Sequence, residues 1–325
     1  MSIPFPVPSA CLTSLDREEF TEPTSGNWEP SASELSPDKG TVMRHSGWAN
    51  DRSKVFEAMK RAGFSASRLA RFAECGSGAW LLVKEGSPSE WRLAANHCKD
   101  RFCKVCQATR TRALAANVAE FIKPSEHRFI TLTVKSNDNT LTEQIDHLLD
   151  SFKRLRRSKE WKFRVKGGVA FMEITFNQRS KQWHPHLHCV VDCSFWLQRD
   201  LSLAWHVASK DSFIVDVRQI RNRQYVARYI VKYATKPIPA ALLYDPSRLT
   251  EMMLALTGRR LIQTFGDWRA ISLTRTSTSE GWICLMSLDD CFWKAEHGDP
   301  FCEAVVRELV SRSCFDNRLP ENFSP

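Results

Sequence analysis

The sequence has no long hydrophobic run, and this absence narrows what the chain can be. No apolar stretch approaches the ~20 residues that a membrane-spanning helix needs. The N-terminal residues also lack a basic segment followed by an apolar core, so we expect no secretory signal peptide. We therefore expect a cytoplasmic protein with no membrane partner.

The cysteines do not have the pattern of a disulfide framework. There are 11, an odd number, and they are unevenly spread along the chain. In a protein that is not exported, such cysteines are expected to be reduced thiols or metal ligands. Four of them have no CxxC spacing, which is typical of buried thiols: Cys284, Cys291, Cys302 and Cys314.

One group of cysteines does have metal-ligand spacing. Cys103 and Cys106 form a CxxC pair, whose geometry lets two thiolates reach one tetrahedral zinc ion. Cys75 and Cys98 can complete a four-cysteine site, and His97 is a spare candidate. A small segment with few apolar residues would need zinc to hold it together. A redox pair or plain buried cysteines are the alternative.

Histidine is also unevenly distributed. Three of the nine histidines, His184, His186 and His188, fall within five residues, and an apolar run follows them. This pattern predicts a buried strand, on which His186 and His188 project from the same face. Pro185 makes the placement of His184 less certain. Two adjacent imidazoles on a strand favour a divalent metal site, with solvated or core histidines as the alternative.

Glu173 is out of place in the apolar strand predicted over residues 169–176. A carboxylate there is costly to bury unless it is paired or binds a metal ion. Because His186 and His188 lie on the next predicted strand, Glu173 could complete a site of two histidines and one carboxylate. His184 is the rival third ligand.

The order of predicted elements indicates an α+β fold. Strands are expected at residues 128–134, 169–176, 184–191 and 213–220, and helices at residues 54–71, 141–160 and 197–210. This order favours a mainly antiparallel sheet with flanking helices. The end of helix 141–160 is basic, which either complements the helix dipole or faces DNA.

Tyrosine is rare, with four residues in the chain, and three of them lie at a spacing of four in one predicted helix: Tyr225, Tyr229 and Tyr233. Lys232 and Lys236 lie on nearly the same side of that helix. A phenol is a poor nucleophile at neutral pH because its pKa is near 10. It becomes useful where a cation stabilises the phenolate and a metal ion polarises the attacked group. An aromatic core stripe is the alternative.

Four segments, in order, resemble the motifs of a known family. FITLTV (129–134), HPHLHCVV (184–191) and YIVKYATK (229–236) look like the three ordered motifs of rolling-circle plasmid replication initiators, which belong to the HUH endonuclease superfamily. CKDRFCKVC (98–106) looks like the cysteine segment that precedes those motifs. The resemblance covers roughly residues 75–240.

This resemblance implies a fold and a reaction. The core would be an RRM-like antiparallel sheet with flanking helices, the HUH endonuclease fold, preceded by a small zinc-binding module. His186 and His188 would bind Mg²⁺ or Mn²⁺. Tyr233, supported by Lys236, would attack a DNA phosphate at the origin and stay linked to the 5′ end. The freed 3′-OH would prime synthesis, and the strand would be rejoined at termination.

The position four residues before Tyr233 departs from many plasmid members, which have a glutamate there. Here it is Tyr229. A Tyr-x-x-x-Tyr pair resembles single-stranded phage initiators and two-tyrosine transposases, in which two phenols alternate. Tyr229 is therefore either a second nucleophile or structural.

The predicted organisation has four parts: a disordered segment (1–50), a helical part with the cysteine module (51–120), the nicking domain (121–240) and a mostly helical C-terminal region (241–325). The expected partners are origin DNA, single-stranded or as a hairpin, with the host helicase and polymerase. Five candidate DNA contacts are basic or aromatic: Lys162, Arg164, Lys166, Lys181 and Trp183. The alternative functions are a two-tyrosine single-strand DNA transposase and a non-catalytic, zinc-containing DNA-binding regulator.

Overall fold

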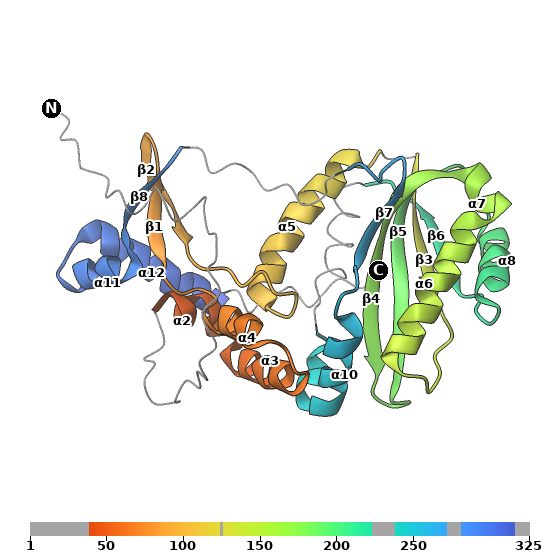
Figure 1. Ribbon diagram of the computed structural model, residues 1–325. Coiled ribbons are helices and arrows are strands. Elements are labelled where there is room, and N and C mark those ends of the chain that lie inside the picture. The colour runs from red at the N-terminus through yellow and green to blue at the C-terminus, as the bar shows by residue number, and fades with distance from the viewer. Residues whose placement is uncertain (1–38, 124–125, 223–237, 272–280, 316–325) are drawn as a thin grey trace. The chain divides into compact units, whose positions relative to one another are not determined.

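The computed structural model describes residues 39–123, 126–222, 238–271 and 281–315. The chain divides into two compact units, each built on its own sheet (Figure 1). The larger unit comprises residues 51–69 and 99–277, and the smaller comprises residues 1–50, 70–98 and 278–325.

A five-stranded sheet forms the centre of the larger unit. Its strand order is β6-β3-β5-β4-β7, and every neighbouring pair is antiparallel. The strands are β3 (His127–Thr133), β4 (Val165–Asn177), β5 (Gln182–Cys193), β6 (Val215–Gln219) and β7 (Ile262–Gly266). The predicted α+β architecture, an antiparallel sheet with flanking helices, is confirmed.

Helix α6 (Leu141–Arg157) covers one face of this sheet. It begins with a capping box, in which the Thr140 hydroxyl accepts from the Glu143 N–H and the Glu143 carboxylate accepts from the Thr140 N–H. Its apolar stripe is buried: Leu141, Ile145, Leu148, Phe152 and Leu155. Helix α8 (Gln198–Ser209) packs beside it, and the short helix α7 (Lys159–Arg164) follows it.

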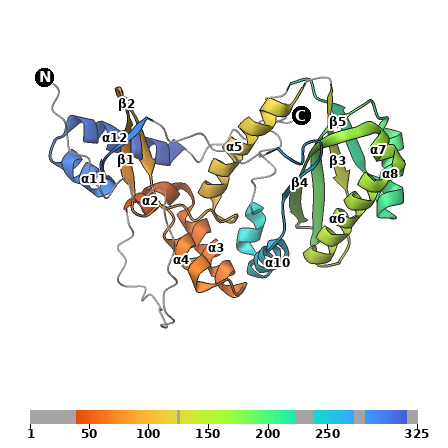
Figure 2. The ribbon, with the colours of Figure 1, turned by 45° about the horizontal axis from the view of Figure 1, so that its top comes forward.

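Helix α5 (Lys104–Phe121) lies on the opposite side of the sheet from α6 (Figures 1 and 2). Leu114 and Val118 of α5, with Ile122, form a core cluster with sheet residues of the opposite face: Phe129, Val169, Phe171 and Val190. Because side chains alternate along a strand, His188 and His186 on β5 share this face with Val190.

Two further described elements of the larger unit lie between β6 and β7 in the sequence. The 3₁₀-helix η2 (Ala240–Tyr244) leads into α10 (Pro246–Leu256), where the Asp245 side chain accepts from the Arg248 N–H at 3.1 Å. Arg101 donates to the carbonyl oxygens of Leu256 and Arg259, at 2.7 and 3.0 Å. These bonds tie the segment around residue 101 to the end of α10.

The smaller unit contains the sheet β2-β1-β8. Its strands are β1 (Trp80–Lys84), β2 (Ser87–Ala94) and β8 (Trp282–Ser287). Helices α11 (Leu288–Glu296) and α12 (Pro300–Phe315) pack together, and Leu81, Cys291, Cys302 and Val305 form the core. Cys291 and Cys302 are buried free thiols, as predicted, whereas Cys284 on β8 is half-buried and disulfide-bonded, so the prediction of a buried thiol is wrong for Cys284.

The structure differs from the sequence prediction at three places. Residues 39–50, predicted to be disordered, form α2 (Lys39–His45), η1 (Ser46–Trp48) and the start of α3 (Ala49–Arg61). The helix predicted over residues 54–71 is interrupted by Gly63, whose φ of 69° is left-handed, and continues as α4 (Ala66–Ala73). Residues 1–38 lie outside the described part of the chain.

The third difference concerns the predicted boundary at residue 240. The mostly helical region predicted after it contains β7 and β8, and each strand joins a sheet formed much earlier in the sequence. The pairing of β7 with β4 therefore places residues 262–266 with the predicted nicking domain. Among the described helices, none combines the length and apolarity needed to cross a bilayer.

Candidate metal centre

The pairing of β4 with β5 brings together Glu173, His186 and His188, which were predicted from the sequence to bind a metal ion. Glu173 is in register with His186, and Phe171 is in register with His188. Residues 173 and 171 on β4 share a face, as do residues 186 and 188 on β5. The three polar side chains therefore meet on the face of the sheet opposite α6.

One carboxylate oxygen lies at the centre of this group. Oε2 of Glu173 is 2.6 Å from Nε2 of His186 and 2.9 Å from Nε2 of His188. The three ligand atoms all lie within 4.8 Å of one another. Glu173 and His188 are buried, with 7% and 4% of their surface exposed, and His186 is half-buried. Such a group can hold a divalent cation with two nitrogen ligands and one oxygen ligand.

Neighbouring groups orient both imidazoles. Nδ1 of His186 lies 3.2 Å from the backbone oxygen of His184, and because a carbonyl oxygen can only accept, this Nδ1 carries a proton. Nδ1 of His188 lies 3.2 Å from the Thr131 hydroxyl. In the neutral His186 ring, Nε2 then presents a lone pair toward a carboxylate that also only accepts. A second ring proton or a metal cation is needed between them, so the residues fit a metal ion.

The acid–base properties of the group also fit a ligand set. Burial alone would raise the pKa of Glu173, but in the metal-free protein hydrogen bonds donated by the Nε2–H groups of His186 and His188 outweigh it and lower the pKa to about 2. Burial lowers the pKa of His188 below its ordinary value. At neutral pH the carboxylate is therefore charged and the His188 imidazole is neutral, which is the form that binds metal ions.

This shift predicts a pH-dependent stability in the metal-free protein. The pKa of Glu173 falls from 4.5 to about 2 on folding. The ionised carboxylate therefore stabilises the folded state above pH 4.5, and this stabilisation is lost as the pH falls toward 2. Glu173→Gln should lower the free energy of unfolding by on the order of 2–3 kcal/mol at neutral pH. Urea denaturation in divalent-free buffer should show the difference shrinking between about pH 5 and about pH 3. A difference that stays constant over this range would contradict the assignment.

His184, the rival third ligand, is not part of the group. Its Nδ1 lies 2.7 Å from the Ser136 hydroxyl, and its ring centroid is 5.6 Å from that of His186. The described geometry thus places Glu173, and not His184, beside His186 and His188.

Asp216 is an acidic residue on the face of the metal centre that was not predicted from the sequence. Asp216 on β6 is in register with Thr131, which is itself in register with His188, so all three share a face. The negative charge of Asp216 acts to raise the pKa of His188, against the stronger effect of burial. Asp216 also pairs with Arg218 at 2.7 Å. An acid in an apolar strand was the signal that pointed to Glu173, and it applies equally to Asp216.

The four cysteines with metal-ligand spacing also lie together. The sulfur atoms of Cys75, Cys98, Cys103 and Cys106 are all within 4.8 Å of one another, and three of these residues are buried. His97 is not in the group. Next to them the buried carboxylate of Asp100 accepts from the Phe102 N–H at 2.9 Å, and it pairs with Arg68. Four thiolates at this separation suit tetrahedral zinc.

The predicted nucleophile helix falls within residues that the structure does not describe. Residues 223–237 lie outside the described part of the chain, and they include Tyr225, which is predicted to be a packing residue, and every predicted catalytic residue: Tyr229, Lys232, Tyr233 and Lys236. The last described strand before them, β6, ends at Gln219 on the edge of the sheet that carries the histidines.

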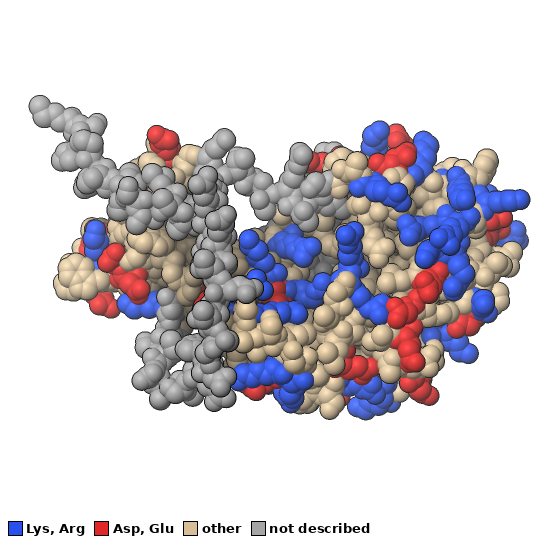
Figure 3. All heavy atoms as spheres, viewed as in Figure 1, with Lys and Arg blue, Asp and Glu red and all other residues tan. Residues whose placement is uncertain are grey.

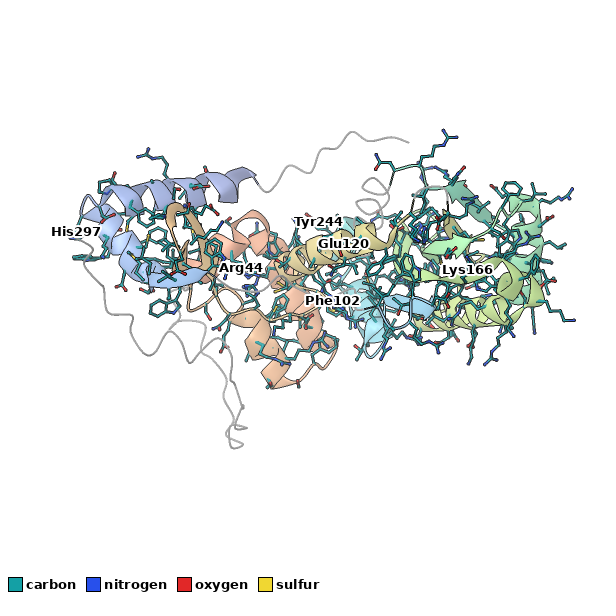
Figure 4. All side chains as sticks on the ribbon, turned by 90° about the horizontal axis from the view of Figure 1, so that it is seen from above. Arg44, Phe102, Glu120, Lys166, Tyr244 and His297 are labelled. Carbon is teal, nitrogen blue, oxygen red and sulfur yellow. The ribbon has the colours of Figure 1, made fainter. Side chains whose placement is uncertain are left out.

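The predicted DNA contacts separate into two groups. Trp183 is 1% exposed and its indole N–H donates to Glu251 at 2.9 Å, so it is a core residue and cannot stack on a base. Lys181 occupies the turn between β4 and β5, with a φ of 57°. Lys162 and Arg164 lie on α7, and Lys166 lies at the start of β4 (Figure 4).

The chain matches one protein-family model and several relatives that all carry the same name. The Rep_1 family model, described as "Replication protein", matches residues 91–279. A "Protein rep" of Staphylococcus aureus is 26% identical over 147 residues, covering 43% of this chain and 64% of the relative. A "Protein rep" of Bacillus amyloliquefaciens is 27% identical over 197 residues, covering 54% of this chain and 57% of the relative.

A third "Protein rep", from Streptococcus pneumoniae serotype 2, is 25% identical over 209 residues, covering 57% of this chain and 65% of the relative. The chain thus spans less than two thirds of the length of these three relatives. No solved structure matches it significantly. The family match extends over both the sheet that carries the histidines and part of the cysteine group. The chain therefore belongs to the Rep_1 family of replication proteins, which confirms the kinship with rolling-circle plasmid replication initiators that its motifs indicated.

Proposed function

We propose that this protein is a metal-dependent, site-specific DNA endonuclease and strand transferase that initiates rolling-circle replication. One observation carries the proposal: a single carboxylate oxygen of Glu173 lies within 2.9 Å of Nε2 of both His186 and His188. Membership of the replication protein family supports origin DNA as the substrate. The antiparallel sheet with the histidines on the face opposite α6 is consistent with an RRM-like HUH fold.

In this proposal, Glu173 is the third ligand, beside His186 and His188. Bound Mg²⁺ or Mn²⁺ would supply a Lewis acid that polarises the scissile phosphodiester. The protein's own contribution is to orient the ligand side chains before the cation binds. Thr131 and the His184 carbonyl fix the two rings, and burial keeps His188 neutral. Ligands that are already oriented lower the cost of binding the cation.

The nucleophile in this proposal is the phenol oxygen of Tyr233. Its bond to phosphorus forms as the bond from phosphorus to the 3′ oxygen breaks, which leaves a 5′-phosphotyrosine and a free 3′-OH. Attack of a 3′-OH on the phosphotyrosine reverses these changes and rejoins the strand. Lys236 and Lys232 would stabilise the phenolate, and Tyr229 would serve as a second nucleophile. Because one phosphodiester is exchanged for another, no further co-reactant is needed.

A nicking assay tests this function. Purified protein is incubated with a supercoiled plasmid that carries its replicon's origin, with Mn²⁺ or in divalent-free buffer. We expect a nicked product that depends on both the origin and the metal ion. Cleavage and joining at the ends of a mobile element, without cleavage at the origin, would instead identify a transposase. Tight origin binding without cleavage under either condition would identify a DNA-binding regulator.

The cysteine group leads to a separate prediction about zinc. We propose that Cys75, Cys98, Cys103 and Cys106 bind one structural zinc ion, since their sulfur atoms lie within 4.8 Å of one another. Replacing Cys103 by serine should lower the zinc content from about one ion per chain to below about 0.2. Native mass spectrometry measures this content. The control is Cys193→Ser, because Cys193 is a buried thiol outside the group and should leave zinc bound. Equal zinc contents in both variants would contradict the assignment.

A further inference from the structure

Two exposed aromatic rings lie at the end of the larger sheet where β4 begins. Phe163 on α7 is 84% exposed, and Phe195, just after β5, is 66% exposed. Arg164 joins the two segments: its Nη1 donates to the Phe195 carbonyl oxygen at 2.8 Å, and its own carbonyl accepts from the Ser194 N–H. Neither phenylalanine side chain contributes to the buried core, so packing does not explain them.

The charge around these rings is strongly positive. Residues 157–166 contain five basic residues against one acid, Glu160. Among the described residues, none of the five basic side chains forms an ion pair with an acid. With the two exposed rings they make up what we call the α7 surface: Arg157, Lys159, Lys162, Phe163, Arg164, Lys166 and Phe195. Figure 3 shows basic side chains gathered over α7 and the adjoining end of α6.

The helix dipole accounts for only part of this charge. Arg157 is in the last turn of α6, where a cation is favourable. Lys166 lies on β4, outside any helix, and α7 is only six residues long. The Arg164 guanidinium lies 6.0 Å from the Phe163 ring and 5.6 Å from the Trp196 ring, so cation and aromatic are held side by side. Basic groups interleaved with exposed aromatic rings are typical of surfaces that bind single-stranded nucleic acid.

The α7 surface is separate from the candidate metal centre but belongs to the same sheet. Along β4 and β5, the register runs from the pair Glu173–His186 to the pair Val165–Cys193. These seven to eight residues correspond to ~25 Å of strand. A DNA strand held at the metal centre can therefore reach this surface only by extending beyond the cleaved bond.

We propose that the α7 surface binds single-stranded DNA flanking the cleavage site. The basic side chains would contact backbone phosphates, and unpaired bases would stack on Phe163 and Phe195. Duplex DNA fits less well, because its bases are already stacked on one another and offer no free face to an aromatic ring. This inference rests on the proposed function, since it takes the DNA of the nicking reaction as its ligand.

Fluorescence anisotropy of the full chain tests the proposal. The probe is a labelled single strand of mixed sequence, about 20 nucleotides long, in divalent-free buffer so that cleavage does not interfere. Phe163→Ala should weaken binding by at least about fivefold, because base–aromatic stacking is lost. Lys162→Ala should reduce the slope of log affinity against log salt by about 0.7. Both side chains lie at the surface of α7, where substitution is least disruptive to folding.

Matched controls lie on α8. Leu203 is a 65% exposed apolar residue, and the Arg199 side chain is 88% exposed and pairs with Asp200. Leu203→Ala and Arg199→Ala should leave affinity within about twofold and the salt slope unchanged. An unchanged affinity for Phe163→Ala, or an equal loss in Leu203→Ala, would overturn the proposal. An equal loss of affinity for a duplex probe would overturn the assignment to single strands.

A second assay separates this inference from the proposed function. An oligonucleotide trimmed to the cleavage site should be nicked equally by wild type and Phe163→Ala, whereas a longer one should be nicked more slowly by the variant at limiting concentrations. Unequal nicking of the trimmed substrate would overturn the inference, because Phe163 would then act on the reaction itself. If wild type cleaves neither substrate, the proposed function fails, while the anisotropy comparison still decides whether the α7 surface binds DNA.

Discussion

Replacing Glu173 by glutamine is expected to lower metal-dependent nicking of origin DNA by about 100- to 1,000-fold, equivalent to ~3–4 kcal/mol of transition-state stabilisation. Glutamine keeps the size of the side chain but removes the negative charge that faces His186 and His188. The cation would then be held by two neutral ligands and would bind more weakly. The measurement is the initial rate of nicking as a function of Mn²⁺ concentration, and excess Mn²⁺ should restore part of the activity.

Two controls separate metal binding from folding. Glu251 is a partly buried carboxylate outside the site, where it accepts from the Leu141 N–H and the Trp183 indole N–H. Glu251→Gln keeps the oxygen that accepts both bonds and loses only the ion pair with Arg248, which lies outside the metal centre, so it should retain nicking within a few-fold. His184→Ala should also have a small effect, because His184 bonds to Ser136 away from the group. A larger loss from His184→Ala than from Glu173→Gln would make His184 the third ligand.

Replacing Tyr233 by phenylalanine is expected to abolish the covalent protein–DNA adduct, because phenylalanine has no oxygen to bond to phosphorus. The adduct is measured as a DNA-linked protein band on a denaturing gel, with Mn²⁺ and a single strand that covers the origin. The band should fall by at least about a thousandfold, as expected when a nucleophile is removed. Binding of the uncleaved strand should be unchanged, which distinguishes a lost nucleophile from a lost fold.

Tyr229→Phe and the double variant decide how many tyrosines act. Adduct in Tyr229→Phe but not in Tyr233→Phe would make Tyr233 the sole initiating nucleophile. Adduct in each single variant, lost only in the double variant, would show that the two phenols are interchangeable and would favour a phage or transposase mode. A band that persists in the double variant would contradict the tyrosine assignment altogether.

Local periodicity was sufficient to predict the faces of individual strands. The two-residue repeat placed His186 and His188 on one side of β5, and the misfit of Glu173 in an apolar strand marked it as paired. Because β4 and β5 are sequential antiparallel strands joined by a short turn, their contact follows from the sequence order. The capping box at Thr140 is equally local, and it fixes where α6 begins.

Pairing over long sequence distances could not be predicted in the same way. Strand β7 is five residues long and only partly buried, so its pattern does not show that it pairs with β4. The hydroxyl of Thr131 reaches His188 across 57 positions in the sequence, and Asp216 reaches the same face through a third strand. Thr131 and Asp216 are neighbours of His188 because of the order of the strands in the sheet, and this order cannot be deduced from a single sequence. The burial of Trp183 likewise involves a residue distant in the sequence, because its indole N–H donates to Glu251.

The most direct test of the account is Mn²⁺ binding, measured by electron paramagnetic resonance as the loss of free-ion signal. Wild-type protein with its zinc retained should bind about one Mn²⁺ per chain. The variant His186→Ala/His188→Ala should bind almost none at the same concentrations, because it has lost two of the three ligand atoms around Glu173. Equal Mn²⁺ binding by both proteins would contradict the claim that Glu173, His186 and His188 form the metal centre.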